Sequence, residues 1–548
     1  MSSAARTPGP SSLAIIANAT PASAMDRLSS AIRRFFDSEQ GAVDRLVPRW
    51  LFLRALGGIY FSAFFSLVFQ IRGLIGPQGI LPANQYLQAV VRSFGTVRGL
   101  WFAPTLLWIS SGPHMLIALC WVGMAASLLL VLNIWPRVML AICFVCFLSF
   151  VSSAQDFSEY QSDGMLLEAG FISLFFAPPG LRPRLGRASP PMRASLFLLQ
   201  WEWFRIYFES GVAKIAGGDT EWRHFTAMDE YYQNGPLPTW IGWYVQHLPH
   251  WFHASTAFAT LALELGLVFM LFLPRRWRIV CFWIVTPWEV GVILTANYTF
   301  LNYLVLCLGV LLLDDSFLLR FFPGRWKGSL LEGSTEAQTP ELTHRPFKVA
   351  KLTLSAVMLT WVFYVTAAEL ISFAPISPPL WPVVALEPFR IANRYGLFGI
   401  MTRGRYEIEF QGSDDGKTWV PYPFRYKPQA LDKAPGIYAP YQPRFDWNLW
   451  FASLGTWREY SIVPRTELRL LANDADVLNL FAGNPFPHQP PHRVRAVIWQ
   501  YWFTTMAEKR SQGLWWRRQF VGLYAPTLER GEDGAIHAIE FPPEGRRE

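Results

Sequence analysis

Long apolar segments recur between about residue 50 and residue 372 of this 548-residue chain. Each approaches the roughly 20 residues that a helix needs to cross a hydrocarbon core about 30 Å thick. They lie near residues 50–70, 113–133, 137–153, 164–177, 194–216, 254–273, 277–295, 299–313 and 350–372, and the fourth is short enough to be re-entrant. Because backbone groups inside lipid must be satisfied within the segment itself, we predict helices. The pattern therefore predicts a mainly α fold, a multi-pass transmembrane helix bundle of about nine spans.

Beyond Phe373 the pattern changes to a proline-rich linker and then to short alternating runs such as RYEIEFQGS and TWVPYPFRY, separated by DDG-type turns. Alternation with a period of two is typical of half-buried β-strands. The run YEIEFQGSDDGKTW resembles the strand–turn–strand of discoidin-like β-sandwiches. VIWQYWF and LWWRRQFVGLYAP add aromatic-rich strands or short helices. We therefore predict a C-terminal β-rich, sandwich-like soluble domain.

The first 48 residues differ again. A Ser, Ala and Pro-rich stretch, typical of disorder, leads into a short basic amphipathic piece from Met25 to Phe36. The stretch SLAIIANA is too short for the apolar core of a secretory signal, and the basic residues follow it, so we expect no cleavage. The chain divides into a disordered, basic N-terminal segment (1–48), a transmembrane helical domain (49–375), a soluble β-rich domain (376–530) and a frayed, charged tail (531–548).

Composition supports a membrane protein. Only 16% of the residues are charged and 52% are hydrophobic, whereas an average soluble chain is roughly a quarter charged. Aromatic residues, which gather where hydrocarbon meets water, make up 16% and include 25 tryptophans. The net charge of +8 lies in short arginine clusters beside apolar runs and not along one face. We therefore expect the lipid bilayer as a partner, and no nucleic acid.

The arginine clusters also predict an orientation. They precede the first segment (Arg33, Arg34, Arg45, Arg49) and follow the second (Arg137), fourth (Arg182, Arg184, Arg187, Arg193), sixth (Arg275, Arg276, Arg278) and eighth (Arg320, Arg325, Lys327). With nine spans, the positive-inside rule places the N-terminus in the cytoplasm and the soluble domain on the far side. The loop with Arg72, Arg92 and Arg98 goes against this pattern.

No metal or cofactor signature is present in the sequence. All five cysteines lie in hydrophobic stretches, and the pair Cys143 and Cys146 has no second ligand pair. The spacing of His224, His247, His250 and His253 matches no metal pattern. There is also no catalytic triad motif and no phosphate-binding glycine loop. We expect neither a metal nor a cofactor.

Charged residues concentrate in the fifth apolar segment. Glu202, Arg205 and Glu209 are spaced i, i+3 and i+7, so they share a helix face and can pair with one another. Lys214 follows near the membrane exit, and other segments contribute further polar residues, namely Glu264, Glu289, Asn297 and Asn302, while Asp156, Glu159, Asp163 and Glu168 lie around the start of the fourth. Charges at this depth should point into the bundle or into a water-filled cavity.

Two interpretations of this intramembrane polar network stay open. The first is a structural ion-pair network that fixes the register of the helices. The second is a functional site, because polar groups within a membrane are candidates for function and a desolvated lysine such as Lys214 can act as a base.

The soluble domain contains candidate recognition residues in FDWNLWFASLG, in NPFPHQPPHRVR and in GLWWRRQF. Tryptophan and arginine dominate protein recognition surfaces. The candidates for binding a client protein are Trp447, Trp450, Arg493, Trp515 and Trp516. The alternative, that they are core and turn residues of the β-domain, carries equal weight.

From about residue 50 to residue 528, the chain resembles the lipase maturation factor family. The resemblance rests on QDFSEYQSDGMLLEAGFISLFFAP, RIYFESGVAKIAGGDTEWRHFTAMDEYYQNGPLP, PHWFHASTAFATLALELG, NYTFLNYLVL, PFRIANRYGLFGIMTRGRYEIEFQGS, PRFDWNLWFASLG, FAGNPFPHQPPHRVR and GLWWRRQFVGLYAP. It implies a non-enzymatic protein of the endoplasmic reticulum membrane whose soluble region helps client lipases to fold and assemble on the lumenal side. If the source is bacterial, the membrane would be the inner membrane and the soluble domain would lie in the periplasm.

A weaker resemblance involves the fifth segment. Lys214, followed by Asp219, Glu221 and Trp222, looks like part of the membrane domain of vitamin K-dependent gamma-carboxylase. It implies an alternative function, a membrane enzyme in which Lys214 is a base that acts on an apolar, quinol-like substrate.

Overall fold

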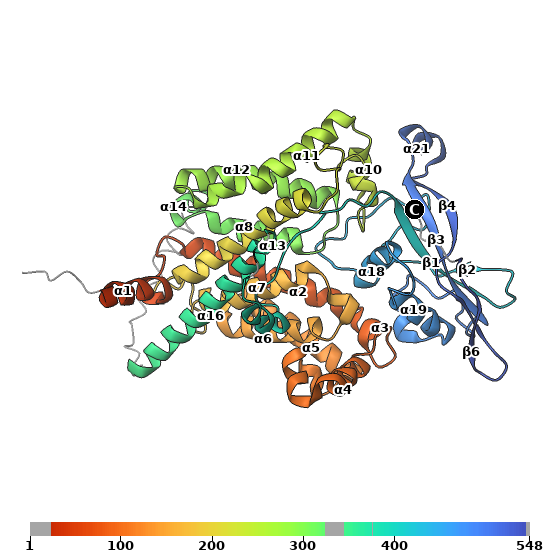
Figure 1. Ribbon diagram of the computed structural model, residues 1–548, viewed down its shortest axis with the longest axis horizontal. Coiled ribbons are helices and arrows are strands. Elements are labelled where there is room, and N and C mark those ends of the chain that lie inside the picture. Colours follow the sequence, from red (N-terminus) through yellow and green to blue (C-terminus); the bar gives the residue numbers. More distant parts are fainter. Residues whose placement is uncertain (1–23, 324–344, 375, 377, 544–548) are drawn as a thin grey trace, which may run out of the picture.

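The computed structural model describes residues 24–323, 345–374, 376 and 378–543. The disorder predicted before residue 24 and the basic residues Arg325 and Lys327 lie outside this part. Within it, a bundle of helices is followed by a β-sheet domain (Figure 1). The basic amphipathic piece at Met25 to Phe36 is helical, as part of α1.

The helices of the bundle follow the apolar segments closely. They are α1 (Ala24–Phe36), α2 (Leu46–Val68), α3 (Ile71–Ile75), α4 (Ala83–Phe102), α5 (Pro113–Val131), α6 (Pro136–Val151), α7 (Gln161–Phe176), α8 (Arg193–Ala216), α9 (Tyr231–Asn234), α10 (Trp240–Gln246), α11 (His250–Leu265), α12 (Arg275–Thr295), α13 (Leu301–Gly309), α14 (Asp315–Leu318) and α16 (Arg345–Ile371). Short 3-10 turns η4 (Leu267–Phe272) and η5 (Val310–Leu312) extend α11 and α13. Pro113 and Pro136 begin α5 and α6, where a missing N–H leaves no hydrogen bond unmade.

All nine predicted segments are helical, but nine spans are not confirmed. Among the described residues, five helices are long and apolar enough to cross a membrane: Leu46–Val68, Pro113–Val131, His250–Phe272, Arg275–Thr295 and Lys348–Ile371. Pro136–Val151 and Leu301–Leu312 are apolar but shorter. α8 is long enough, at 24 residues, but it carries the charged residues described above. It packs against α7, α11, α13 and α16, inside the bundle.

The basic loops gather at one end of the bundle. The Arg45 side chain donates to the carbonyl oxygen of Leu311, and that of Arg49 to the carbonyl oxygen of Leu185. Arg275 pairs with Asp314. Figure 1 shows α1 and α14 at this end and the sheet at the opposite end of the molecule. Of the arginines that predict the orientation, Arg45, Arg49 and Arg275 therefore lie far from the C-terminal sheet.

The C-terminal domain is built on one antiparallel sheet of six strands with the order β2-β1-β3-β5-β6, in which β4 also pairs with β3. The strands are β1 (Arg405–Ser413), β2 (Val420–Pro421), β3 (Arg493–Phe503), β4 (Trp516–Leu523), β5 (Thr527–Arg530) and β6 (Ile536–Glu540), and the helices are α17 (Trp381–Leu386), α18 (Arg444–Ser453), α19 (Ile462–Leu471), α20 (Ala475–Leu478) and α21 (Met506–Gln512). In the long β1–β3 pairing, Ile408 lies opposite Ile498.

The prediction of a β-sandwich is wrong, because among the described residues helices and not a second sheet form the second layer of the domain. In the described part of the domain, the helices α18 and α19 pack on β1 and β3 where a second sheet would lie. Phe410 of β1 stacks on Phe445 of α18. The reason is that RFDWNLWFAS, at 444–453, buries nearly every residue as a helix and not as alternate residues of a strand.

Two local expectations also need correction. In TWVPYPFRY, only Val420–Pro421 forms a strand. The tail expected to fray after residue 530 instead contains Ile536–Glu540, which pairs with Thr527–Arg530. Residues 544–548 lie outside the description. The apolar core is continuous between the two parts of the chain, since a single buried cluster includes Phe52 of α2 and Ile498 of β3.

Candidate functional site

Arg205 is the centre of a buried ion cluster between α7 and α8. Its guanidinium pairs with Glu168 of α7 and lies 3.5 Å from Glu209, four residues on in α8. It also donates to the carbonyl oxygen of Asn393 at 2.7 Å. Arg205, Glu168 and Glu209 are almost completely inaccessible to solvent. The structure thus brings Arg205 and Glu209 together, as their spacing suggests, and adds Glu168 from another helix.

Glu202 does not join these pairs. It is fully buried, and neither of its carboxylate oxygens has a hydrogen-bond partner among the described residues. The pairing with Arg205 that the i, i+3 spacing allows is therefore not formed as a hydrogen bond.

The backbone after α17 completes the cluster. The N–H of Asn393 donates to Glu168 at 2.9 Å, and the N–H of Tyr395 donates to Glu209 at 2.6 Å. Backbone donors have no side-chain signature, so nothing in the sequence marks Asn393 or Tyr395 as partners. The linker between the bundle and the sheet is therefore held inside the bundle by buried, charge-assisted hydrogen bonds.

Lys214 lies in a second polar group, beside a cavity. Its Nζ is 2.8 Å from a carboxylate oxygen of Glu264 on α11 and 5.1 Å from the ring centroid of Trp222. The cavity has a volume of about 410 Å³, within the range of roughly 300–1,000 Å³ found for small-molecule sites. Its walls come from α8 to α13 and from the loop segments at 222–228 and 395–398.

Glu289 of α12 forms a third group on the same cavity. Its two carboxylate oxygens accept hydrogen bonds from the hydroxyl of Tyr207 and the amide of Asn302, each at 2.6 Å. Tyr207, which the sequence reasoning did not single out, thus belongs with Glu289 and Asn302. The single polar network predicted from the sequence therefore divides into two neighbouring sites. One is the ion cluster around Arg205, and the other is the cavity lined by Lys214, Glu264, Glu289 and Asn302.

Asn297 is not part of either site. Its amide donates to the carbonyl oxygens of Leu237 and Gly436, and its side-chain oxygen accepts from the N–H of Tyr438 and Ala439. It therefore holds a loop of the C-terminal domain against the bundle.

Two arginines of the C-terminal domain make similar connections. Arg444 of α18 pairs with Asp163 of α7 through both carboxylate oxygens, at 2.7 and 2.8 Å. Arg405 of β1 donates to the backbone carbonyl oxygens of Gln233, Gly235 and Pro236. Both arginines are at most 2% exposed. The bundle and the sheet domain are therefore joined by buried polar contacts as well as by the shared core.

The client-binding candidates differ in accessibility. Trp447, Trp450 and Trp516 are buried in the domain. The indole N–H of Trp450 donates to the carbonyl oxygen of Asn234. Trp515 and Arg493 are half-buried; Trp515 lies against Trp243 and Lys509, and Arg493 pairs with Glu529. In this conformation, only Trp515 and Arg493 of the five present surface to a partner.

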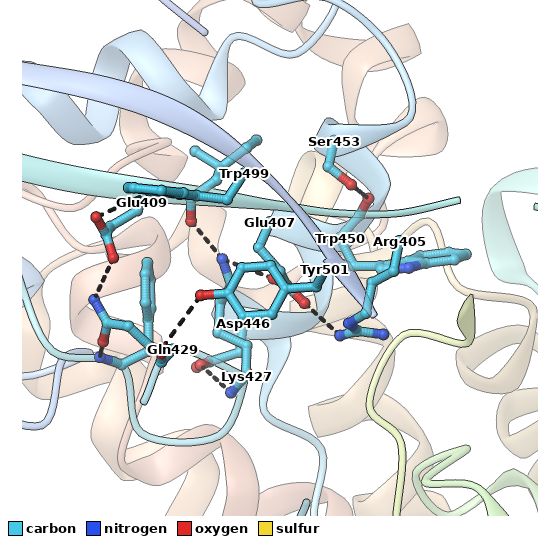
Figure 2. Close-up of polar contacts among 12 residues, drawn as sticks. Arg405, Glu407, Glu409, Lys427, Gln429, Asp446, Trp450, Ser453, Trp499 and Tyr501 are labelled. Atoms are coloured by element: carbon cyan, nitrogen blue, oxygen red, sulfur yellow. Dashed lines mark hydrogen bonds and ion pairs between the residues drawn. The ribbon is translucent and has the colours of Figure 1, made fainter. Parts of the chain in front are cut away.

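A further buried polar cluster connects β1 with the segment at 426–429 and with α18 (Figure 2). Glu407 pairs with Arg405 on one side and lies 2.9 Å from the Lys427 ammonium on the other. Asp446 of α18 accepts hydrogen bonds from the backbone N–H groups of Tyr426 and Lys427. Burial raises the pKa of Asp446 to about 6, although these hydrogen bonds lower it.

This raised pKa predicts how the stability depends on pH. In the unfolded chain, Asp446 has the ordinary pKa of 3.8, so its contribution to folding is complete below pH 4, is lost as the pH rises to about 6, and is constant above. Asp446→Asn keeps the acceptor but does not titrate. The free energy of unfolding of the unmodified chain, relative to this variant, should fall by about 2–3 kcal/mol between pH 4 and pH 6. Unfolding midpoints of both full chains across this range check the prediction, and parallel profiles would contradict it.

The rest of the candidate chemistry is sparse in the described part of the chain. No group of three or more His, Cys, Asp and Glu side chains there could hold a metal ion. Cys143 and Cys146 are buried, free thiols on α6. Asp219, from the carboxylase-like pattern, is held in place by the N–H groups of Met401 and Glu221. Partial burial alone would raise its pKa, but these two hydrogen bonds, together with Arg403, lower it.

Comparison with known proteins agrees with this architecture. A family model for the lipase maturation factor transmembrane domain matches residues 47–320, and a model for the lipase maturation factor C-terminal domain matches residues 391–526. The chain belongs to the lipase maturation factor family. The resemblance found in the sequence is thereby confirmed.

Individual members of the family match over most of their length. The chain is 33% identical to lipase maturation factor 1 of Bos taurus, covering 88% of this chain and 89% of the relative. It is 32% identical to lipase maturation factor 2 of Gallus gallus (88% and 82%) and 31% identical to lipase maturation factor 2 of Homo sapiens (89% and 83%). No solved structure matches the chain.

The two matched regions of the family meet at the sites described above. Arg205, Lys214, Glu264 and Glu289 lie in the first region. The second begins at residue 391, immediately before the backbone donors to Glu168 and Glu209. In this member of the lipase maturation factor family, the start of the C-terminal domain is thus built into the ion cluster of the helix bundle.

Proposed function

We propose that the chain is a membrane-bound maturation factor that assists the folding and assembly of client lipases. The observation that carries the proposal is the match of both parts of the chain to the lipase maturation factor family, over nearly nine-tenths of its length. The integral membrane character agrees with the five candidate spans.

We further propose that the C-terminal domain lies on the lumenal or periplasmic side and the N-terminus in the cytoplasm. Positive residues favour the cytoplasmic side, and the arginine-rich loops gather at the end of the bundle opposite the sheet (Figure 1). The membrane would be that of the endoplasmic reticulum, as the family suggests, or the inner membrane of a bacterium.

Client recognition is proposed for the C-terminal domain. Of the five candidates, the partly exposed Trp515 and Arg493 fit this role directly. Trp447, Trp450 and Trp516 would reach a client only after a rearrangement, because they pack inside the domain. The buried contacts of Arg444 and Arg405 with the bundle mean that recognition is best studied in the full chain.

The alternative, a membrane enzyme with Lys214 as base, is favoured by one observation: Lys214 lines a cavity of small-molecule size. The hydrogen bonding argues for a structural role. The Lys214 ammonium donates to Glu264 at 2.8 Å, whereas a base must present a free lone pair to its substrate.

The double variant Lys214→Met with Glu264→Gln is expected to retain most lipase maturation. It removes both charges of the pair, so neither is left buried alone. Lys214→Met by itself should accumulate less, since breaking a buried pair costs about 3–5 kcal/mol. The readout is the activity per molecule of a secreted lipase, co-expressed with the full chain in cells that lack a maturation factor.

The outcomes separate the two functions. Complete loss of maturation in the double variant, at matched expression, would favour Lys214 as a base. If the unmodified chain itself does not raise lipase activity above that of cells without it, the proposed function is wrong.

A further inference from the structure

The cavity beside Lys214 holds two buried acceptor atoms that lack donors. Asn302 is 8% exposed and Glu264 is 9% exposed, and both line the cavity. The second carboxylate oxygen of Glu264 and the side-chain oxygen of Asn302 have no hydrogen-bond partner among the described residues. A buried polar group that is left without its hydrogen bond destabilises the fold, so a ligand that supplies the missing donors is favoured.

The orientation of these acceptors is set by their neighbours. The Asn302 amide nitrogen donates to Glu289, which also accepts from Tyr207. Because the amide nitrogen must face Glu289, the Asn302 oxygen is left as an acceptor. Lys214 likewise fixes one oxygen of Glu264 and leaves the other. A ligand that fits these atoms must therefore donate hydrogen bonds.

Much of the remaining wall is apolar or aromatic, as in a site for a hydrophobic tail, although Ser210, Thr256, Thr260, Thr295 and several tyrosines also line it. The apolar part includes Trp222, Phe252, Trp288, Val292 and Phe398. The wall contains two carboxyl groups, Glu264 and Glu289, and one amine, Lys214, which pairs with Glu264. This excess of carboxyl groups disfavours an anionic head group.

The cavity has an opening in the surface of a candidate span. Gly291 of α12 lines the cavity and is itself exposed, and no atom lies within 4 Å of the position that its Cβ would occupy. α12 is the candidate span with the smallest buried share, 17%. A molecule dissolved in the bilayer can therefore enter beside Gly291.

We propose that this cavity binds a neutral lipid with a hydroxylated head group, of the monoacylglycerol class. Its hydroxyl groups donate to Glu264 and Asn302, and its acyl chain lies along the aromatic wall and leaves past Gly291. The site is separate from lipase maturation, and its test does not use lipase activity.

The test uses the full chain in phosphatidylcholine nanodiscs, because phosphatidylcholine has no hydroxyl donor, with tritiated 1-monooleoylglycerol as the probe. We expect saturable binding that unlabelled monooleoylglycerol displaces at least about tenfold more effectively than oleate, the anion, or methyl oleate, which has no donor. Equal displacement by methyl oleate would show a site that selects only apolar volume, and better displacement by oleate would show an anion site. Either result overturns the proposal, as does the absence of saturable binding.

Two glycines give a matched pair of variants. Gly291→Phe places a ring in the cavity mouth, whereas Gly58→Phe places the same ring on the exposed face of α2, where the Cβ also has no atom within 4 Å. Binding should fall at least about tenfold in Gly291→Phe and stay unchanged in Gly58→Phe. If Gly291→Phe unfolds at a lower temperature than Gly58→Phe, the test is repeated with Thr256→Phe, which fills the cavity from α11. Equal binding by the cavity variants and the α2 variant would place the lipid elsewhere.

Discussion

Replacing Arg205 by methionine is expected to destabilise the full chain by about 3–5 kcal/mol, or to prevent its accumulation. Arg205 is completely buried and is the cation that faces Glu168 and Glu209. Without it, two carboxyl groups would stay in the bundle close to each other. Their backbone donors, Asn393 and Tyr395, would remain but supply no positive charge.

The measurement is the fraction of full chain that stays monodisperse after heating in detergent. Arg92→Met is the matched control, since Arg92 is exposed on α4 and its loss should shift the midpoint little. Adding Glu168→Gln to Arg205→Met should restore part of the loss by removing one unpaired charge. Equal midpoints for Arg205→Met and Arg92→Met would show that the ion cluster does not stabilise the fold.

The helices of the bundle could be predicted because their signal is local. Apolar runs of sufficient length report a membrane helix without knowledge of its neighbours, and all nine segments are helical in the structure. How many of them cross the bilayer depends on tertiary packing, which a run of residues does not reveal. α7 and α8 show this, since Arg205 of α8 pairs with Glu168 of α7, and Glu168 also accepts a hydrogen bond from the backbone of the linker.

The polar site could be predicted only as far as helix periodicity reaches. The spacing of Arg205 and Glu209 in α8 reports their contact, because residues four apart lie on one face. Glu168, Asn393 and Tyr395 come from other elements, at sequence separations that no local rule covers. The split into an ion cluster and a cavity likewise depends on how α8 packs against α11 and α13. Asn297 lies outside both because its partners are in loops, at Leu237 and Gly436.

In the C-terminal domain, prediction from the sequence was limited by a local pattern that fits more than one kind of element. The apolar residues of FDWNLWFAS fit both the period of two of a β-strand and the period of 3.6 of a helix, so the pattern does not distinguish a buried strand from a helix. The structure resolves it as α18, with Phe445 in the sheet core and Trp447 and Trp450 turned toward the bundle loops. Tryptophans that suggested an exposed recognition surface therefore belong to the junction between the two parts.

This junction explains why the two family regions act as one structural unit. The carboxylates of the bundle at Glu168, Glu209 and Asp163 take their donors from residues after 390. A chain truncated at residue 375 would leave all three buried without these donors. Loss of function in such a truncated chain would report misfolding of the bundle and not the loss of client contacts alone.

The Asp163–Arg444 pair is expected to show the strongest coupling between the two parts of the chain. Its bidentate geometry, with both side chains at most 2% exposed, is the kind that stabilises buried ion pairs. Arg444 also donates to the carbonyl oxygen of Phe157 at 2.6 Å. We expect Arg444→Met or Asp163→Asn alone to cost about 3–5 kcal/mol, because each leaves the other charge buried.

A double-mutant cycle on the full chain measures this coupling, with Arg493 and Glu529 as the matched comparison. The second pair has a similar contact, at 2.6 Å, but its side chains are 34% and 31% exposed, so its coupling should not exceed about 1 kcal/mol. The Arg444→Met, Asp163→Asn double variant should be less destabilised than the sum of its single variants by about 2 kcal/mol or more, since no lone charge remains. Additive effects at Arg444 and Asp163 would mean that the shared apolar core alone joins the C-terminal domain to the bundle.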